Sequence, residues 1–187
     1  MAASHMFYYS LSYLGLYRTK PTKLVFVGLN HAGKSSLLQN CADHVPDFAA
    51  ATSHTSHPGS DSETLIKGNV SFTTLDVGRH HRDRELWIES IRGALGIVFM
   101  VDAHDTKRFD EAAAELHALS AAEELEGVPF LVLGNKIDHP DAITTAQVIR
   151  DRLRVDEIQN RPIRVFMCSV AARLGYGEGI GWLASKI

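Results

Sequence analysis

The segment Gly28-Leu-Asn-His-Ala-Gly-Lys-Ser35 combines residue types at a spacing that could bind phosphate. It fits G-x-x-x-x-G-K-[ST], follows a short apolar run and precedes a sequence that predicts a helix. Glycines let backbone N–H groups turn inward around phosphate oxygens, and a helix N-terminus adds the positive end of its dipole. In such a loop Lys34 reaches the β- and γ-phosphates, while the Ser35 hydroxyl ligates Mg²⁺. The residues expected to line the phosphates are Asn30, His31, Ala32, Gly33, Lys34, Ser35 and Ser36.

Asp76 is the next candidate, because it ends a strand-like run and could place a carboxylate beside the phosphates. A carboxylate there can hold the same Mg²⁺ as Ser35, usually through water, since Mg²⁺ keeps several of its waters. Taken alone, Asp76 could equally be a helix N-cap or a turn residue. Its position after a strand and downstream of a phosphate loop favours the metal interpretation.

The motif Asn135-Lys-Ile-Asp138 follows another apolar run and could recognise a nucleotide base. The Asp138 carboxylate can accept hydrogen bonds from the N1–H and the exocyclic amine of guanine, whereas adenine presents the wrong pattern. Lys136 can cover the base with its stem, and Asn135 can tie this segment to the phosphate loop. A later segment, Cys168-Ser169-Val170, would offer backbone N–H groups to the guanine oxygen. Together these motifs predict a guanine nucleotide as the ligand.

Composition limits the remaining classes of protein. The chain has 187 residues, of which 45% are hydrophobic and 22% charged, as expected for one packed domain. The formal net charge of -3 gives no basic field for nucleic acid, and two cysteines argue against a disulfide scaffold. Ten histidines raise the question of a metal site, but the pairs His54/His57 and His80/His81 lack the cysteine or carboxylate cluster that would complete a ligand set. We therefore expect these histidines to bind no metal.

The elements that must position the motifs alternate between strand and helix patterns. Short β-branched apolar runs predict buried strands, and apolar residues at helical spacing predict the helices between them. Gly68-Asn69 indicates a hairpin, and the segment 47–61 has the composition of a loop. The expected strands are 23–28, 63–67, 70–75, 97–101, 129–133 and 163–167, and the expected helices are 34–40, 82–91, 108–120, 144–153 and 179–186. This order predicts an α/β fold, with a mainly parallel six-stranded sheet, one antiparallel edge and helices on both faces.

The first 20 residues need a separate interpretation. Residues 1–6 resemble a remnant of an expression vector followed by a second start methionine, and no secretory signal peptide is indicated. Residues 7–20 are aromatic and aliphatic and end in cations. They could lie on a membrane surface with the cations at the headgroups, or pack on the protein's own surface. We place the nucleotide-binding domain at residues 21–187.

The order of the motifs resembles that of Ras-like small GTPases, and the chain is similar to their Arf/Sar branch. Within that branch it is similar to the Sar GTPases of the COPII coat, from about residue 14 to residue 187. The stretches that carry the similarity include Leu14-Gly-Leu-Tyr17, Phe72-Thr-Thr-Leu-Asp76, Leu133-Gly-Asn-Lys-Ile-Asp138, Val165-Phe-Met-Cys-Ser-Val170 and Gly175-Tyr-Gly-Glu-Gly179. The resemblance implies the small G-protein fold of P-loop NTPases, a GTPase domain at residues 21–187, and GTP or GDP with Mg²⁺ as cofactors.

The resemblance also implies an activity and partners. It implies slow hydrolysis of GTP to GDP and phosphate, with His80 positioning the attacking water and Lys34 contacting the phosphates. The switch would serve COPII coat assembly in protein transport from the endoplasmic reticulum to the Golgi. Its partners would be the inner coat with its GTPase-activating subunit, a membrane-bound exchange factor and the membrane of the endoplasmic reticulum, bound through the N-terminal segment. The implied location is cytoplasmic, peripheral on endoplasmic reticulum and Golgi membranes.

Two switch positions depart from the pattern of that family. The family has a second glycine before the histidine that follows Asp76, whereas this chain has Arg79 before His80. It also has a threonine after His-Pro, whereas this chain has Gly59. Both changes fall on parts that sense the γ-phosphate, so two functions stay open: a hydrolysing switch, or a GDP-holding protein that does not switch. An ATP-using P-loop kinase is disfavoured by the Asn-Lys-x-Asp motif.

Overall fold

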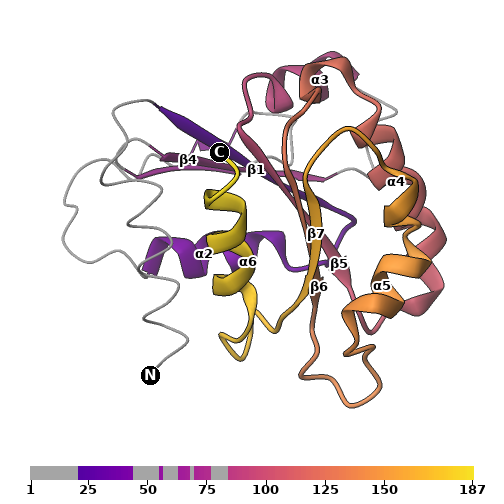
Figure 1. Ribbon diagram of the computed structural model, residues 1–187. Coiled ribbons are helices and arrows are strands. Elements are labelled where there is room, and N and C mark those ends of the chain that lie inside the picture. The colour runs from indigo at the N-terminus through magenta and orange to yellow at the C-terminus, as the bar shows by residue number, and fades with distance from the viewer. Residues whose placement is uncertain (1–20, 44–54, 57–62, 68–69, 77–83) are drawn as a thin grey trace.

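A computed structural model of the chain describes residues 21–43, 55–56, 63–67, 70–76 and 84–187. In these residues a seven-stranded sheet has the strand order β2-β3-β4-β1-β5-β6-β7 (Figure 1). Strands β4, β1, β5, β6 and β7 run parallel to one another, β3 pairs antiparallel with β4, and β2 pairs antiparallel with β3. The bounds are β1 Thr22–Gly28, β2 Thr55–Ser56, β3 Glu63–Lys67, β4 Val70–Asp76, β5 Gly96–Asp102, β6 Phe130–Asn135 and β7 Ile163–Met167.

The expected α/β fold with a mainly parallel sheet and an antiparallel edge is therefore confirmed. The sheet has one strand more than the expected six, because β2 lies within the segment 47–61 that composition assigned to a loop. A strand of two residues is too short to leave an alternating pattern in the sequence. Its pairing with β3, rather than its own composition, makes it a strand.

Helices cover both faces of the sheet (Figure 1). On one face α3, α4 and α5 pack over a cluster of buried side chains that includes Ile91, Leu116 and Ile149. On the other face α2 and α6 pack over a second cluster that includes Leu37 and Ile180. The helix bounds are α2 Lys34–Asp43, α3 Arg84–Ile91, α4 Phe109–Ser120, α5 Ala146–Arg152 and α6 Tyr176–Ala184, with short 3-10 turns at Thr106–Arg108, Glu123–Leu125 and Val155–Glu157. None of the helices among the described residues is long and apolar enough to cross a membrane.

Helix α6 begins at Tyr176, three residues before the expected start at Gly179. Glycines disfavour helix in isolation, so the sequence Tyr-Gly-Glu-Gly hides this first turn. The packing explains why glycine is present, since a Cβ on Gly179 would lie only 2.9 Å from Cδ1 of Leu131 in β6. The small residue lets the helix approach the sheet closely, and Tyr176 is buried against it, 3% exposed.

Arg161 joins the end of α4 to the edge of the sheet. Its guanidinium donates to the carbonyl oxygens of Leu125 at 2.8 Å and Ser120 at 2.6 Å. The same group lies over the ring of Phe130, 4.7 Å from its centroid. Partial burial lowers the pKa of Arg161 from its usual value, although an arginine remains charged throughout the physiological range. The contacts fix the chain just before β7, whose far end leads to the candidate site.

Candidate functional site

The phosphate-loop motif connects β1 directly to α2. Strand β1 ends at Gly28, helix α2 begins at Lys34, and the first helical hydrogen bond runs from the N–H of Leu37 to the oxygen of Gly33 at 2.9 Å. The first turn of an α-helix has N–H groups without an acceptor inside the helix. Here that turn contains the exposed residues Ser35 and Ser36. The strand-loop-helix context that the sequence pattern requires for an anion site is therefore present.

Lys34 spans the loop from its helical end back to its first residues. Its ammonium donates to the carbonyl oxygens of Gly28 and Leu29, each at 2.8 Å. These contacts hold a full positive charge across the loop at the N-terminus of α2. A phosphate that enters the loop meets this charge together with the helix dipole.

Close packing explains the glycine at position 33. Gly33 has a φ of +102°, and a Cβ there would lie 2.3 Å from Nδ2 of Asn135. Residues with a side chain are excluded both by the backbone conformation and by this contact. His31 also has a positive φ, 66°, which is uncommon for a residue other than glycine and indicates local strain.

Asn135 ties the phosphate loop to the loop after β7. Its side chain is buried, and Nδ2 donates to the carbonyl oxygen of Ala32 at 2.9 Å. Its Oδ1 accepts from the N–H of Val170 at 2.9 Å and from the thiol of Cys168 at 3.7 Å. The hydrogen bond to Ala32 is the tie between the two motifs that the sequence suggested. One amide side chain thus sets the relative position of three loops.

The Asn-Lys-x-Asp loop places two charged side chains at the same edge of the sheet. The Ser169 hydroxyl donates to the Asp138 carboxylate, and it accepts from the N–H of Ala172 at 2.9 Å. The Ser169 hydrogen bond, followed by a backbone N–H, lowers the pKa of the exposed Asp138 carboxyl below its usual value. The ammonium of Lys136 pairs with the Asp102 carboxylate at 2.6 Å. Asp138 is therefore held as a carboxylate, which is the form that could accept two hydrogen bonds from guanine.

Cys168 is a structural residue, as its burial in an apolar cluster indicates. Its N–H donates to the oxygen of Gly134 at 2.8 Å, and its own oxygen accepts from Ile137 at 3.2 Å. Burial, with a smaller contribution from the nearby Asp138 carboxylate, raises the pKa of the Cys168 thiol to about 12. The thiol is therefore protonated at neutral pH and cannot act as a nucleophile.

Two of the expected site residues lie partly or wholly outside the described residues. The Cα of Asp76 is the register partner of the Cα of Gly28, so the backbone of Asp76 is adjacent to the start of the phosphate loop. The structure describes no side chain for Asp76, and His80 is outside the described ranges, as are Arg79 and Gly59. A serine hydroxyl and an aspartate carboxylate are both oxygen ligands of the kind that Mg²⁺ prefers. The identity and backbone placement of Ser35 and Asp76 therefore fit a Mg²⁺ site.

The structure also brings in residues that sequence reasoning missed. Asp102 pairs with Lys136, and Asn40 of α2 donates to the oxygen of Val170 at 2.9 Å. Asp102 could have been found, because it ends the buried strand next to the one that Asn135 ends. Asn40 carries no such signal, since an asparagine within a helix is unremarkable in sequence.

The fold and the loop geometry are those of a small G protein, and comparison with known proteins identifies the family. The ADP-ribosylation factor family matches residues 7–187. A small COPII coat GTPase SAR1 from Giardia intestinalis is 36% identical over 95% of each chain, and one from Nicotiana tabacum is 32% identical over 97% of this chain and 96% of its own. ADP-ribosylation factor K from Dictyostelium discoideum is 35% identical over 90% of this chain and 86% of its own. The chain therefore belongs to the ADP-ribosylation factor family of small GTPases, with relatives among both the SAR1 and the ADP-ribosylation factor proteins.

Proposed function

We propose that this protein is a Sar-like switch that binds GDP and GTP, hydrolyses GTP slowly and directs assembly of a COPII vesicle coat. The observation that carries the nucleotide part is the buried amide of Asn135. Its side chain joins the phosphate loop at Ala32 to the loop at Val170, and Asn135 is itself the first residue of the Asn-Lys-x-Asp motif proposed to recognise the base. A chance glycine loop would have no reason to be tied to an Asn-Lys-x-Asp motif about 100 residues further along the chain.

Each motif then has a distinct task toward the nucleotide. The N–H groups around Gly33 and the ammonium of Lys34 hold the phosphates, and Asp138 accepts from the guanine edge while the Lys136 stem covers the base. The backbone N–H groups of residues 168–170, which the sequence assigned to the guanine oxygen, instead donate within the protein. Their acceptors are the oxygens of Gly134 and Leu174 and Oδ1 of Asn135. Mg²⁺, held by Ser35 and Asp76, would supply charge neutralisation between the β- and γ-phosphates.

The coat function rests on similarity to the two SAR1 proteins, both named as small COPII coat GTPases. The partners that follow are the inner coat with its GTPase-activating subunit and a membrane-bound exchange factor. Residues 7–20 would provide a surface anchor on the endoplasmic reticulum membrane, outside the GTPase domain at 21–187. The similarity to ADP-ribosylation factor K makes membership of the other branch of the same family the competing assignment.

Base specificity provides the first test of this proposal. We expect GDP to bind far more tightly than ADP in calorimetry with Mg²⁺ present. Asp138→Asn should weaken GDP binding and favour xanthosine diphosphate, because an amide presents a donor where the carboxylate presented an acceptor. Asp141→Asn is a matched control that changes an exposed aspartate of the same loop. Equal affinity of the wild type for GDP and ADP would refute the nucleotide assignment.

Arg79 supports a second candidate function, that of a GDP-holding protein that does not switch. Arg79 stands where a glycine N–H is expected to approach the γ-phosphate, and a Cβ with a bulky stem hinders such an approach. Single-turnover hydrolysis of GTP, with and without a coat activator, separates the two functions. Hydrolysis that the activator accelerates supports the switch, in which His80 and Lys34 act on the phosphates. No acceleration in the wild type, together with acceleration in Arg79→Gly, would support the GDP-holding protein.

A further inference from the structure

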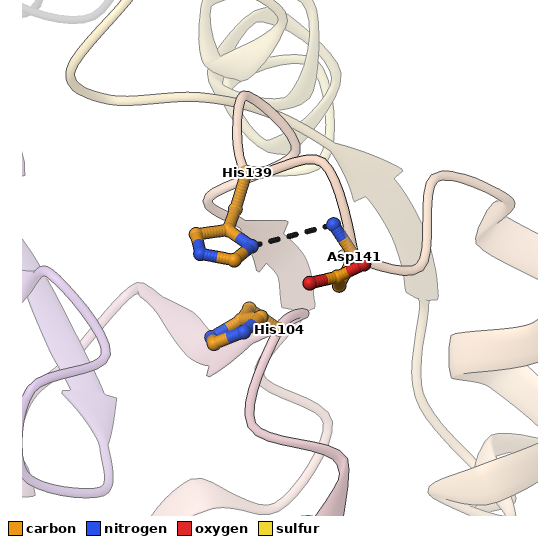
Figure 2. Close-up of side chains that lie close together, drawn as sticks. All are labelled: His104, His139 and Asp141. Carbon is orange, nitrogen blue, oxygen red and sulfur yellow. Dashed lines mark hydrogen bonds between the residues drawn. The ribbon is translucent and has the colours of Figure 1, made fainter.

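Two exposed histidines and an exposed aspartate meet beside the Asn-Lys-x-Asp loop (Figure 2). His104 lies in the loop after β5, whereas His139 and Asp141 lie in the loop after β6. The centroids of the two imidazole rings are 3.6 Å apart, with 37° between the ring planes. One ligand atom from each of the three residues lies within 4.8 Å of the other two. Elsewhere in the described part of the chain no other trio of His, Cys, Asp or Glu comes together in this way.

Backbone hydrogen bonds between the two loops hold this arrangement in place. The N–H of Ala103 donates to the oxygen of Asn135 at 2.8 Å, and the oxygen of Ala103 accepts from the N–H of Ile143 at 3.0 Å. The N–H of His104 donates to the Asp102 carboxylate at 3.0 Å. The loop that carries His104 is therefore fixed against both ends of the loop that carries the other two residues.

The loop after β6 is also tied to itself. The N–H of His139 donates to the oxygen of Lys136 at 3.0 Å, and the oxygen of His139 accepts from the N–H of Ala142 at 3.1 Å. The backbone N–H of Asp141 donates to Nδ1 of His139 at 3.3 Å, as Figure 2 shows. This turn places the Asp141 carboxylate beside the histidine ring. The backbone of the two loops thus brings the three side chains together.

The chemistry of the three side chains selects a class of ion. Imidazole nitrogens suit Zn²⁺, Ni²⁺, Co²⁺ and Cu²⁺, whereas Mg²⁺ prefers oxygen ligands. Metal–ligand bonds of about 2.0–2.1 Å around tetrahedral Zn²⁺ put neighbouring ligand atoms about 3.4 Å apart. The ligand atoms lie within 4.8 Å of one another, so binding of Zn²⁺ requires the exposed side chains to rotate until these separations reach that value. The 3.3 Å contact at Nδ1 of His139 is long for a hydrogen bond, so a metal ion can replace it.

We propose that His104, His139 and Asp141 form a binding site for a divalent transition-metal ion, with water in the remaining positions. This proposal departs from the sequence-based expectation that the histidines bind no metal, because the fold adds the Asp141 carboxylate to His104 and His139. The site is separate from the proposed Mg²⁺ ligands Ser35 and Asp76, and its ligands do not depend on the function proposed above. Because His139 directly follows Asp138, the bound ion would link the base-reading loop to the loop after β5.

The test uses Zn²⁺ alone as the probe, titrated by calorimetry into the full chain loaded with GDP and Mg²⁺ at pH 7.5. We expect the wild type to bind one more equivalent of Zn²⁺ than the double variant His104→Ala/His139→Ala. Either single substitution should lower the affinity for that Zn²⁺ by about tenfold or more. Even a change to a residue that only supports a metal ligand lowers metal affinity about 10–100-fold. His117→Gln is the matched control, because its ring contacts the oxygen of Leu153 instead. Ni²⁺ should bind to the same site as Zn²⁺, and additional Mg²⁺ should not bind there.

Zn²⁺ binding of equal stoichiometry and affinity in the wild type and the double variant would overturn the proposal. Because all three side chains are exposed, the variants should keep the melting temperature of the wild type in EDTA. A second measurement needs no variant. In heteronuclear NMR spectra of the wild type, Zn²⁺ should shift the ring signals of His104 and His139 together. Failure of these two signals to move would refute the site independently.

Discussion

Replacement of Asn135 by alanine tests whether one buried amide sets the geometry of the candidate site. The substitution removes the hydrogen bonds at 2.9 Å to the oxygen of Ala32 and from the N–H of Val170. Both partners belong to buried residues, 1% and 3% exposed, so water cannot readily replace the lost amide. An unsatisfied buried donor or acceptor costs about 1–3 kcal/mol, which gives a loss of about 2–6 kcal/mol for the pair.

Urea unfolding at a fixed excess of GDP and Mg²⁺ measures this loss, since bound ligand contributes to apparent stability. With a slope of about 2 kcal/mol/M for the dependence of unfolding free energy on urea, the midpoint should fall by about 1–3 M. Asn40→Ala is the graded comparison, because it removes a side-chain bond to the oxygen of Val170 from a half-buried position in α2. Its loss should be smaller, about 1 kcal/mol.

Asn135→Ala should also release a fluorescent GDP analogue faster than the wild type, because the phosphate loop loses its support. An unchanged urea midpoint in Asn135→Ala would refute the assignment of Asn135 as the tie between loops. If Asn135→Ala lost no more free energy of unfolding than Asn40→Ala, the magnitude derived from burial would be wrong. Lowered stability with unchanged GDP release would separate the structural contribution from the nucleotide site.

Three further predictions follow from the described contacts. Ser169→Ala removes the main cause of the lowered pKa of Asp138, so the pKa of this carboxyl should rise in the variant. The affinity for GDP, measured by calorimetry from pH 7 to pH 4, should therefore fall at a higher pH in the variant than in the wild type. The pKa of Asp138 is lower in the folded protein than in the unfolded chain, so its ionised carboxyl stabilises the folded state at pH values above the unfolded pKa. This contribution is lost as the pH falls through the pKa of the folded state. Cys41 and Cys168 are both buried, and burial raises the pKa of Cys168 to about 12, so a thiol reagent at pH 8 should modify neither cysteine until the protein unfolds. Reaction at the rate of a free thiol would contradict the burial. Arg161→Ala removes two carbonyl contacts and a ring contact and should cost about 2–4 kcal/mol in urea unfolding, whereas a loss below about 0.5 kcal/mol would show that the guanidinium is not needed there.

The class of protein could be predicted from the sequence because its two main motifs are local. A phosphate loop is a short backbone conformation between a strand and a helix, and both the glycines and Lys34 that it requires lie within eight consecutive residues. The buried strands were equally visible, since parallel strands covered on both faces read as continuous apolar runs. The sequence therefore determined the mainly parallel sheet apart from β2, the helix order and the chemistry expected at the strand ends.

The particular contacts between the loops were decided by the tertiary structure, although the motif had already suggested that Asn135 ties its loop to the phosphate loop. Asn135 meets Ala32 across 103 residues, Lys136 meets Asp102 across 34, and the two histidines of the cluster come from different loops. The carboxyl ends of neighbouring parallel strands lie at one edge of the sheet, so residues remote in sequence are brought together there. Which of their side chains touch depends on strand register and on hydrogen bonds between loops. These are set by the packing of the whole chain and leave no periodic pattern in any single segment.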